Sequence, residues 1–202
     1  MEVVLESWTG NPEITCAKGM LSCRSEKASG EIEIDLETAR EKMRNARLMG
    51  HYGCFEPAVF VFSVKEVSRS LTHQLVRHRM ASYLQQSQRA VKIGAPSYVT
   101  PPNIKDNLEA LGEYDALMQE IWMKYGELQE KFKIEKQDAR FVLPNACTTN
   151  IQITMNARTL LHFFRLRLDS HAQWEIREMA DRMHGLVMEV APSIFEVIPG
   201  DV

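Results

Sequence analysis

The chain has 202 residues, of which 45% are apolar and 25% are charged, and its formal net charge is −3. This length suffices for one sizeable core, and the mildly acidic balance excludes a chain that is basic throughout, so an anion site requires a local cluster of Arg or Lys. No window approaches the roughly 20 apolar residues of a membrane-spanning helix, and the N-terminus lacks a secretory signal. We therefore expect a cytoplasmic protein, without a membrane segment, that forms a single domain over residues 1–202.

Short strands and helices alternate in the first part of the chain. The pattern predicts strands at 2–8 and 13–16, a helix at 35–49, a strand at 57–67 and a helix at 68–79. The two short strands flank the turn Asn11-Pro12, and Gly50 marks the end of the first helix. Both alternating sets of residues at 57–67 are mainly apolar, which predicts a strand buried on both faces.

The second part of the chain is mainly helical. It predicts a loop leading into a strand at 82–93, an irregular connection at 94–103, a long helix at 106–132, a short helix ending at Pro144, a strand at 150–155, and helices near 157–168 and 172–190. The apolar side of the long helix is expected to include Leu108, Leu111, Leu117, Ile121, Tyr125, Leu128 and Phe132. This alternation favours an α+β or α/β fold.

A first cluster of cations follows the helix predicted at 68–79. Arg77, His78 and Arg79 are consecutive, and three such side chains at a helix end spread over an arc of about 200°, so at least one should point inward or across a subunit contact. Guanidinium groups suit bidentate binding of phosphate, and a Ser hydroxyl with backbone amides can complete the cradle. The polar residues that surround this cluster are Gln74, Gln85, Gln86, Ser87, Gln88 and Arg89. A nucleotide or flavin phosphate site and a solvated helix end with ion pairs both remain open.

A second cluster comprises Arg158, Arg165 and Arg167, which alternate with apolar residues. Cations inside an apolar run are costly unless they are paired or bind an anion. Next along the chain, His171, Glu175 and Glu178 have the spacing i, i+4 and i+7, but no HExxH motif occurs. We therefore favour capping and ion pairing of the last helix, and expect no metal site.

Several enzyme classes lack their motifs in this chain. The sequence contains no GxSxG, no GxxxxGK[ST] and no GxGxxG after a strand, which argues against a serine hydrolase, a P-loop nucleotidase and a Rossmann dehydrogenase. The four cysteines show no paired CxxC spacing, so reduced thiols are expected.

Four ordered motifs resemble the flavin-dependent thymidylate synthases, the thymidylate synthase-complementing protein family. The segment RHRMASYLQQSQR, from Arg77 to Arg89, is similar to the family's RHR-x7-S signature, with Ser87 as its serine. Upstream, Gly50-His51 and Phe55-Glu56 resemble the family's GHxSxxEH segment. Downstream, the similarity continues through Asn156-Ala157-Arg158 and Arg167-x3-His171-Ala172-Gln173-Trp174-Glu175-Ile176. The chain departs from the family pattern at Gly53, Pro57 and Ala90.

The resemblance implies an α+β fold, with a mixed α/β core lobe and a helical lobe, and a homotetramer whose sites are shared between subunits. It implies FAD as cofactor, and dUMP, NADPH and methylenetetrahydrofolate as substrates. By the same similarity, the flavin site would comprise Arg77, His78, Arg79, Asn156, Arg158 and His162, with His51 near the flavin of a neighbouring chain. The dUMP site would comprise Gln74, Arg77, Gln85, Gln86, Ser87, Gln88, Arg89, Arg140 and Arg167.

The activity that the resemblance implies is the reductive methylation of dUMP to dTMP. Arg167 is the expected catalytic residue, because a fixed guanidinium near N3 and O2 of uracil would stabilise negative charge on the ring. Pairing with Asp169 or Glu175 is its alternative role. No cysteine lies in a matching motif, so no covalent cysteine intermediate is expected.

Two other functions remain to be weighed. A nucleic-acid-binding module would use the two cation clusters on phosphates, but the acidic net charge and the lack of a long basic face argue against it. A related flavoenzyme could act on another pyrimidine nucleotide.

Overall fold

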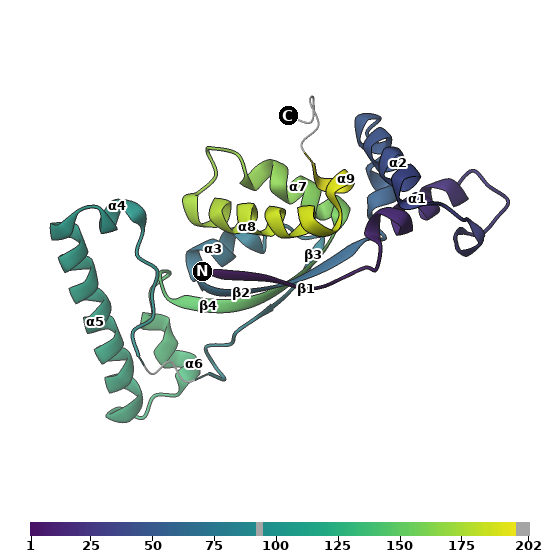
Figure 1. Ribbon diagram of the computed structural model, residues 1–202. Helices are drawn as coiled ribbons and strands as arrows, with labels where there is room; N and C mark the ends of the chain where they lie inside the picture. Colours follow the sequence, from purple (N-terminus) through teal and green to yellow (C-terminus); the bar gives the residue numbers. More distant parts are fainter. Residues whose placement is uncertain (92–94, 197–202) are drawn as a thin grey trace. The chain divides into compact units, whose positions relative to one another are not determined.

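The structure is a computed structural model that describes residues 1–91 and 95–196. Its helices and strands (Figure 1) are, in order, β1 (Glu2–Trp8), α1 (Pro12–Ser22), η1 (Ser29–Glu31), α2 (Leu36–Leu48), η2 (Tyr52–Phe55), β2 (Val59–Ser68), α3 (Arg69–Leu75), β3 (Ala81–Gln85), α4 (Pro102–Lys105), α5 (Leu108–Glu130), α6 (Lys136–Ala139), η3 (Arg140–Val142), β4 (Thr148–Asn156), α7 (Ala157–Arg167), α8 (Trp174–Val190) and α9 (Pro192–Phe195). Helices combined with an antiparallel sheet confirm the predicted α+β class.

The chain forms two compact units. The first contains Met1–Val64, Leu75–Leu84 and the described residues from Gln152 onward, and the second contains Lys65–Gln74 and the described residues of Gln85–Ile151. The strands form one four-stranded sheet in the order β1-β2-β4-β3. None of the helices in the described ranges has the length and apolar content to cross a membrane.

Strand β2 supplies much of the core of the first unit. Phe60, Phe62 and Val64 point to one face and are fully buried, because successive side chains of a strand point to opposite faces. On the other face Val59 is 38% exposed and Val61 is half-buried. The prediction of a strand at 57–67 is confirmed, but its burial on both faces is wrong, because only one face is fully covered.

The helices α7 and α8 lie over the sheet in Figure 1, and α8 packs on both β1 and α7. An aromatic contact joins α7 to α9, since the ring centroids of Phe164 and Phe195 are 5.8 Å apart. Phe195 also contacts Phe60 of β2 edge-on at 5.4 Å. Helix α7 is therefore packed against α9, which in turn packs on β2, and α7 carries several predicted site residues.

Three predictions near the sheet are wrong. Residues 13–16 belong to α1, where Pro12 occupies the first turn and Asn11 has a φ of 48°; Pro is well suited to this position because its fixed φ matches the helix. The helix predicted at 68–79 ends at Leu75. At 82–93, where a loop leading into a strand is predicted, the order is reversed: the strand β3 comes first and irregular chain follows it. Residues 92–93 lie outside the described residues.

The second unit is mainly helical. The long helix predicted at 106–132 is confirmed as α5, whose first turn is capped by the Asn107 side chain accepting from the amide of Ala110 at 3.1 Å. Its buried residues are Met118, Trp122 and Tyr125. The predicted apolar side is wrong in part, since Leu108 is 84%, Leu117 52% and Phe132 55% exposed.

Candidate functional site

The segment Arg77-His78-Arg79 lies in the turn between α3 and β3, within the first unit. Arg77 and Arg79 are exposed, whereas His78 is only 8% exposed. The hydroxyl of Tyr83 shares its one proton between the carbonyls of Leu75 at 2.9 Å and of His78 at 2.8 Å. Burial raises the pKa of Tyr83 to about 12, so this hydroxyl keeps its proton and remains a donor. The prediction that one of the three side chains points inward is confirmed for His78.

The imidazole of His78 contacts the end of α7. Arg167 is the last residue of that helix, and its Nε donates to Nε2 of His78 at 3.0 Å. The ring also packs edge-on against Phe163, with centroids 5.0 Å apart. Burial lowers the pKa of His78 to about 4, helped by the charge of Arg167 and by His162. His78 is therefore neutral near pH 7, with Nε2 as acceptor and the proton on Nδ1.

The pKa of His78 leads to a prediction about stability. Because the folded-state pKa lies below the ordinary value of 6.5, the unfolded chain binds this proton first as the pH falls. The contribution of neutral His78 to the free energy of unfolding is present above pH 6.5 and is lost as the pH falls towards about 4. Urea unfolding between pH 7 and pH 4.5 should show a shallower loss of stability in His78→Gln than in the unsubstituted protein. Equal pH slopes would contradict the depressed pKa.

The start of α7 holds two predicted flavin residues. Asn156 is the N-cap, and its Oδ1 accepts from the amide of Thr159 at 2.9 Å. Thr159 in turn donates from Oγ1 to the carbonyl of Met80 at 3.1 Å, which ties the end of the Arg77–Arg79 segment to α7. Arg158 is exposed and forms an ion pair with Glu56 at 2.5 Å. This pair joins two of the four motifs that support the family resemblance.

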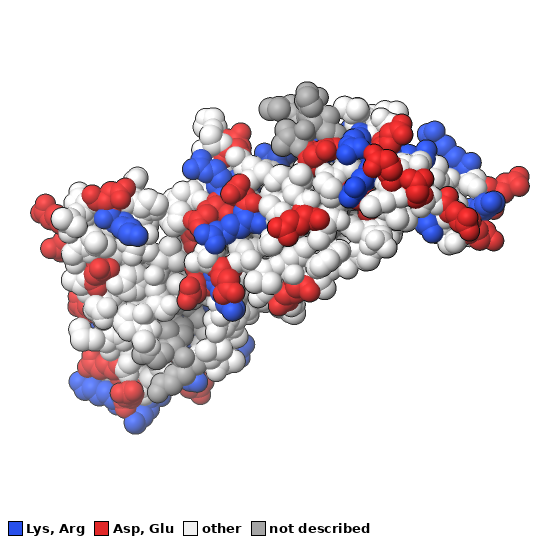
Figure 2. Space-filling model, in the orientation of Figure 1, with Lys and Arg blue, Asp and Glu red and all other residues white. Residues whose placement is uncertain are grey.

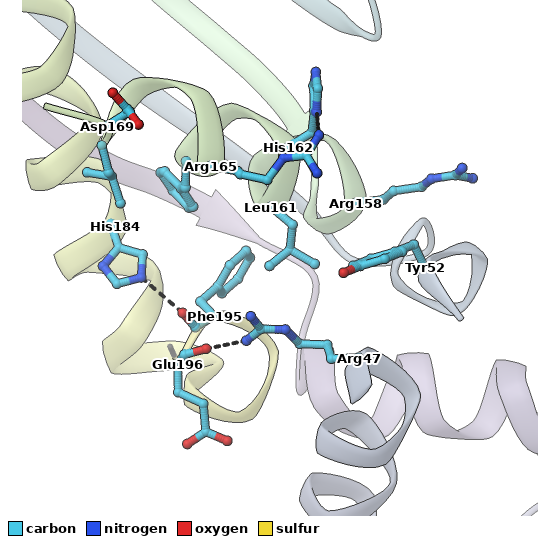
Figure 3. Close-up of a pocket in the computed structure, with 12 residues that line it drawn as sticks. Arg47, Tyr52, Arg158, Leu161, His162, Arg165, Asp169, His184, Phe195 and Glu196 are labelled. Carbon is cyan, nitrogen blue, oxygen red and sulfur yellow. Dashed lines mark hydrogen bonds between the residues drawn. The ribbon is translucent and has the colours of Figure 1, made fainter. Parts of the chain in front are cut away.

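A cavity of about 650 Å³ adjoins this part of the first unit (Figure 3). Its lining combines aromatic and aliphatic side chains with cations and two acidic residues, and comprises Arg47, Tyr52, Arg158, Leu161, His162, Phe164, Arg165, Leu168, Asp169, His184, Phe195 and Glu196. His162 and Arg158 come from the exposed side of α7, and Arg165 lies 3.4 Å from Nδ1 of His162. The cavity thus includes two of the predicted flavin residues, and its aromatic and aliphatic walls suit a flat group.

His51 lies at the start of η2 in the first unit, where it is exposed. Two positions along, an added Cβ at Gly53 would meet nothing within 4 Å. The departure from the family's hydroxyl residue at Gly53 therefore does not reflect a lack of space in this chain.

Most of the predicted dUMP residues lie in the second unit. The amide of Gln86 donates to the carbonyl of Asn150 at 2.9 Å, which fixes the strand end from which the segment 85–89 continues. Gln85 donates from Nε2 to Oγ1 of Thr72 at 3.2 Å. Gln88 donates to Sγ of Cys147 at 3.7 Å.

The remaining predicted dUMP residues of the second unit have more solvent access. The amide of Arg89 donates to Oγ of Ser87 at 3.2 Å, and both residues are exposed. Gln74 is half-buried near the end of α3. Arg140 begins η3, and its Nε donates to the carbonyl of Gln137 at 3.1 Å. The predicted anion cradle at Ser87 and Arg89 stays a prediction.

Arg69 is a residue that the sequence reasoning missed. Its Nη2 donates to the carbonyl of Gln86 at 2.9 Å, and its amide donates to the carbonyl of Cys147 at 3.1 Å. Burial lowers the pKa of its guanidinium. Arg69 thus helps to hold the segment that begins at Gln85. Its spacing matches none of the motifs, so only its place directly after a buried strand could have drawn attention to it.

The structure does not support the metal alternative at His171, Glu175 and Glu178 within the described residues. Among residues 1–91 and 95–196, no group of three His, Cys, Asp or Glu side chains is placed to hold an ion. His171 pairs with Asp169 at 2.9 Å, and Glu178 pairs with Arg182 at 2.7 Å. The predicted ion pairing of the last long helix is confirmed by the second of these pairs.

Comparisons with known proteins agree with the arrangement of the motifs. The family model described as thymidylate synthase complementing protein matches residues 4–193. The flavin-dependent thymidylate synthase of Clostridium tetani is 43% identical over 97% of this chain and 86% of its own. That of Geobacter sulfurreducens is 39% identical over 96% of this chain and 85% of its own.

A solved structure shows the same fold. It is a UMP/dUMP methylase, PolB, from Streptomyces cacaoi, bound with 5-Br dUMP, with a TM-score of 0.87 and 21% identity over 96% of this chain and 93% of that one. Sequence and structure therefore define an enzyme, of the methyltransferase class. The chain belongs to the thymidylate synthase complementing protein family, the flavin-dependent thymidylate synthases, as the motifs predicted.

Proposed function

We propose that this protein converts dUMP to dTMP, with methylenetetrahydrofolate as carbon donor and FAD, reduced by NADPH, as hydride source. When bound, these groups supply the chemistry: the folate provides the methylene carbon, and the reduced flavin provides the hydride that completes the methyl group. The proposal places this enzyme in the cytoplasm as a single domain over residues 1–202. It also includes a homotetramer in which His51 lies near a neighbouring chain's flavin.

The observation that carries the proposal is the way in which Arg167 is held. Arg167 donates from Nε to Nε2 of His78. Both Nη nitrogens can then meet a planar acceptor edge, such as O2 and N3 of uracil. Because a guanidinium is always protonated, Arg167 would stabilise negative charge on the ring and would not act as a base.

The flavin would be held by polar and cationic residues of the first unit. We assign this role to Arg77, Arg79, Asn156, Arg158 and His162. His78, which the resemblance also implies for the flavin site, is buried between the two arginines and accepts from Arg167. The donor set fits the group, because Arg158 and His162 line a cavity whose other walls include Leu161, Phe164 and Phe195. Apolar walls suit the flat ring, and guanidinium groups suit the pyrophosphate.

The substrate phosphate would be held by the second unit's segment 85–89. Within the second unit, Arg89 would bind the phosphate with Ser87, and dUMP contacts would also come from Gln74, Gln85, Gln86, Gln88 and Arg140. Within the first unit, Arg77 and Arg167 would bind dUMP. Burial raises the pKa of Cys16 to about 12 and also raises that of Cys147. Neither thiol is therefore activated as a nucleophile. This supports the proposed reaction, which forms no covalent bond between a cysteine and dUMP.

The nucleic-acid alternative has less support. On the face that Figure 2 shows, Lys and Arg are interspersed with Asp and Glu, without a long basic stripe. Sequence-independent binding to nucleic acid depends on neutralising several successive phosphates. An interspersed pattern does not favour that mode.

An absorbance spectrum tests the proposed function. The purified protein with added FAD should show flavin bands that bleach under anaerobic NADPH, and reoxidation should then change when dUMP is present. Turnover of dUMP, UMP and dCMP, measured in parallel, would identify the nucleotide. A protein that never retains flavin would remove the basis of the proposal, and steeply salt-dependent DNA binding would then favour the nucleic-acid alternative.

A further inference from the structure

His78 differs from its two arginine neighbours in its access to solvent. It is 8% exposed, whereas Arg77 and Arg79 are exposed. Its side chain packs edge-on against Phe163 at 5.0 Å between ring centroids. A buried imidazole of this kind has little surface with which to contact a ligand. Its polar contact with another side chain is the bond from Arg167 to Nε2.

The backbone of His78 is fixed on both sides. Its amide donates to the carbonyl of Leu75 at 3.1 Å, and its carbonyl accepts from the hydroxyl of Tyr83 at 2.8 Å. Two residues further on, the carbonyl of Met80 accepts from Thr159 of α7 at 3.1 Å. The imidazole is therefore presented to α7 from a turn that is itself tied to α7.

Arg167 needs such support because of its position. It is the last residue of α7 and is half-buried, and a long side chain at a helix end loses substantial rotamer entropy when it is fixed. A single bond at Nε sets the plane of the guanidinium while the Nη nitrogens remain oriented outward from that bond. Orientation of this kind lowers a reaction barrier when it is established before the substrate binds.

We propose that His78 is a positioning residue for Arg167: its neutral Nε2 accepts from Arg167 Nε and so orients the guanidinium towards the uracil ring. This inference rests on the proposed function, because it takes Arg167 as the catalytic group. It explains why a histidine lies between two exposed arginines in the turn. His78 would thus contribute to the shared site through Arg167, while Arg77 and Arg79 would contact the ligands.

A pair of amide substitutions tests this inference. In His78→Gln, the terminal oxygen is as many bonds from Cβ as Nε2 of histidine, so it can accept from Arg167. In His78→Asn, the amide is one bond shorter and falls short of Arg167. We expect kcat for dTMP formation to stay within about 3-fold of the unsubstituted protein in His78→Gln and to fall about 10- to 100-fold in His78→Asn. Equal kcat values in the two variants would overturn the inference.

Two further readouts separate positioning from a general structural effect. NADPH-dependent bleaching of bound flavin should be unchanged in His78→Asn, and loss of flavin in that variant would instead indicate a direct flavin contact and overturn the inference. In an Arg167→Lys background, His78→Asn should change kcat less than about 2-fold, because the partner is already gone. A full additional loss in that background would show that His78 acts independently of Arg167.

A measurement on the unsubstituted protein covers the case in which the variants do not fold. With ¹⁵N-labelled histidine, NMR at pH 7 should show His78 neutral, with Nε2 unprotonated and Nδ1 protonated. A proton on Nε2 would overturn the inference, because that nitrogen could not accept from Arg167. If the unsubstituted protein forms no dTMP, the proposed function fails, whereas normal turnover in His78→Asn contradicts only the role of His78.

Discussion

Replacing Arg167 with alanine is expected to reduce dTMP formation about 10²- to 10³-fold while the flavin remains bound. The substitution removes the guanidinium that would stabilise negative charge on the uracil ring, and removing one preorganised donor of that kind typically has an effect of this size. The cations assigned to the flavin, including Arg158 with its ion pair to Glu56, stay in place. Steady-state turnover and the flavin spectrum of the same preparation measure both effects.

Two matched variants sharpen this test. Arg167→Lys keeps the positive charge but lacks the planar guanidinium, so its turnover should lie between that of the unsubstituted protein and that of Arg167→Ala. Arg182→Ala removes an arginine of α8 that pairs with Glu178 at 2.7 Å, and it should leave turnover unchanged. Near-normal turnover in Arg167→Ala with flavin bound would mean that another group stabilises the ring, and the catalytic assignment would be abandoned.

Replacing Arg89 with alanine is expected to raise KM for dUMP about 10- to 100-fold, with a smaller effect on kcat. Arg89 is exposed, and its amide donates to Oγ of Ser87 at 3.2 Å. In the proposed function its guanidinium binds the phosphate. A contact to a charged group that persists from the bound substrate to the transition state affects KM more than kcat. Initial rates over a range of dUMP concentrations measure this change.

Deoxyuridine provides the control for Arg89, because it lacks the phosphate. Turnover of deoxyuridine should be low and equal in the unsubstituted protein and in Arg89→Ala. Lys105→Ala removes a cation at the end of α4 and should not change KM for dUMP. If Arg89→Ala weakened the use of deoxyuridine and dUMP equally, Arg89 would not be a phosphate ligand.

The elements with strong local signals were predicted well. The helices at 35–49, 157–168 and 172–190 and the strands at 2–8 and 150–155 all occur, with ends shifted by a few residues. Their patterns are long or strongly periodic, and their caps are local: Asp35 accepts from the amide of Thr38 at 2.9 Å at the start of α2. Such signals depend on neighbours within one turn, so the sequence contains them in full.

The errors share a different origin. The buried face of α5 was misassigned because its centre is at Met118 and Trp122, which pack with Cys147 from a distant part of the chain. The short stretch 13–16 is compatible with either a strand or a helix. In the structure it belongs to α1, which packs against α2. For short segments, contacts with other elements outweigh local propensity.

The sequence by itself determined the family, the α+β class and the set of candidate site residues, because the motifs lie in fixed order and spacing along the chain. Only the tertiary structure decided what those residues touch. It buried His78 against Phe163 and Arg167, it paired Arg158 with Glu56, and it placed Arg69 against the carbonyl of Gln86. These partners are separated by 17 to 102 positions, and contacts at such separations form only when the whole chain packs.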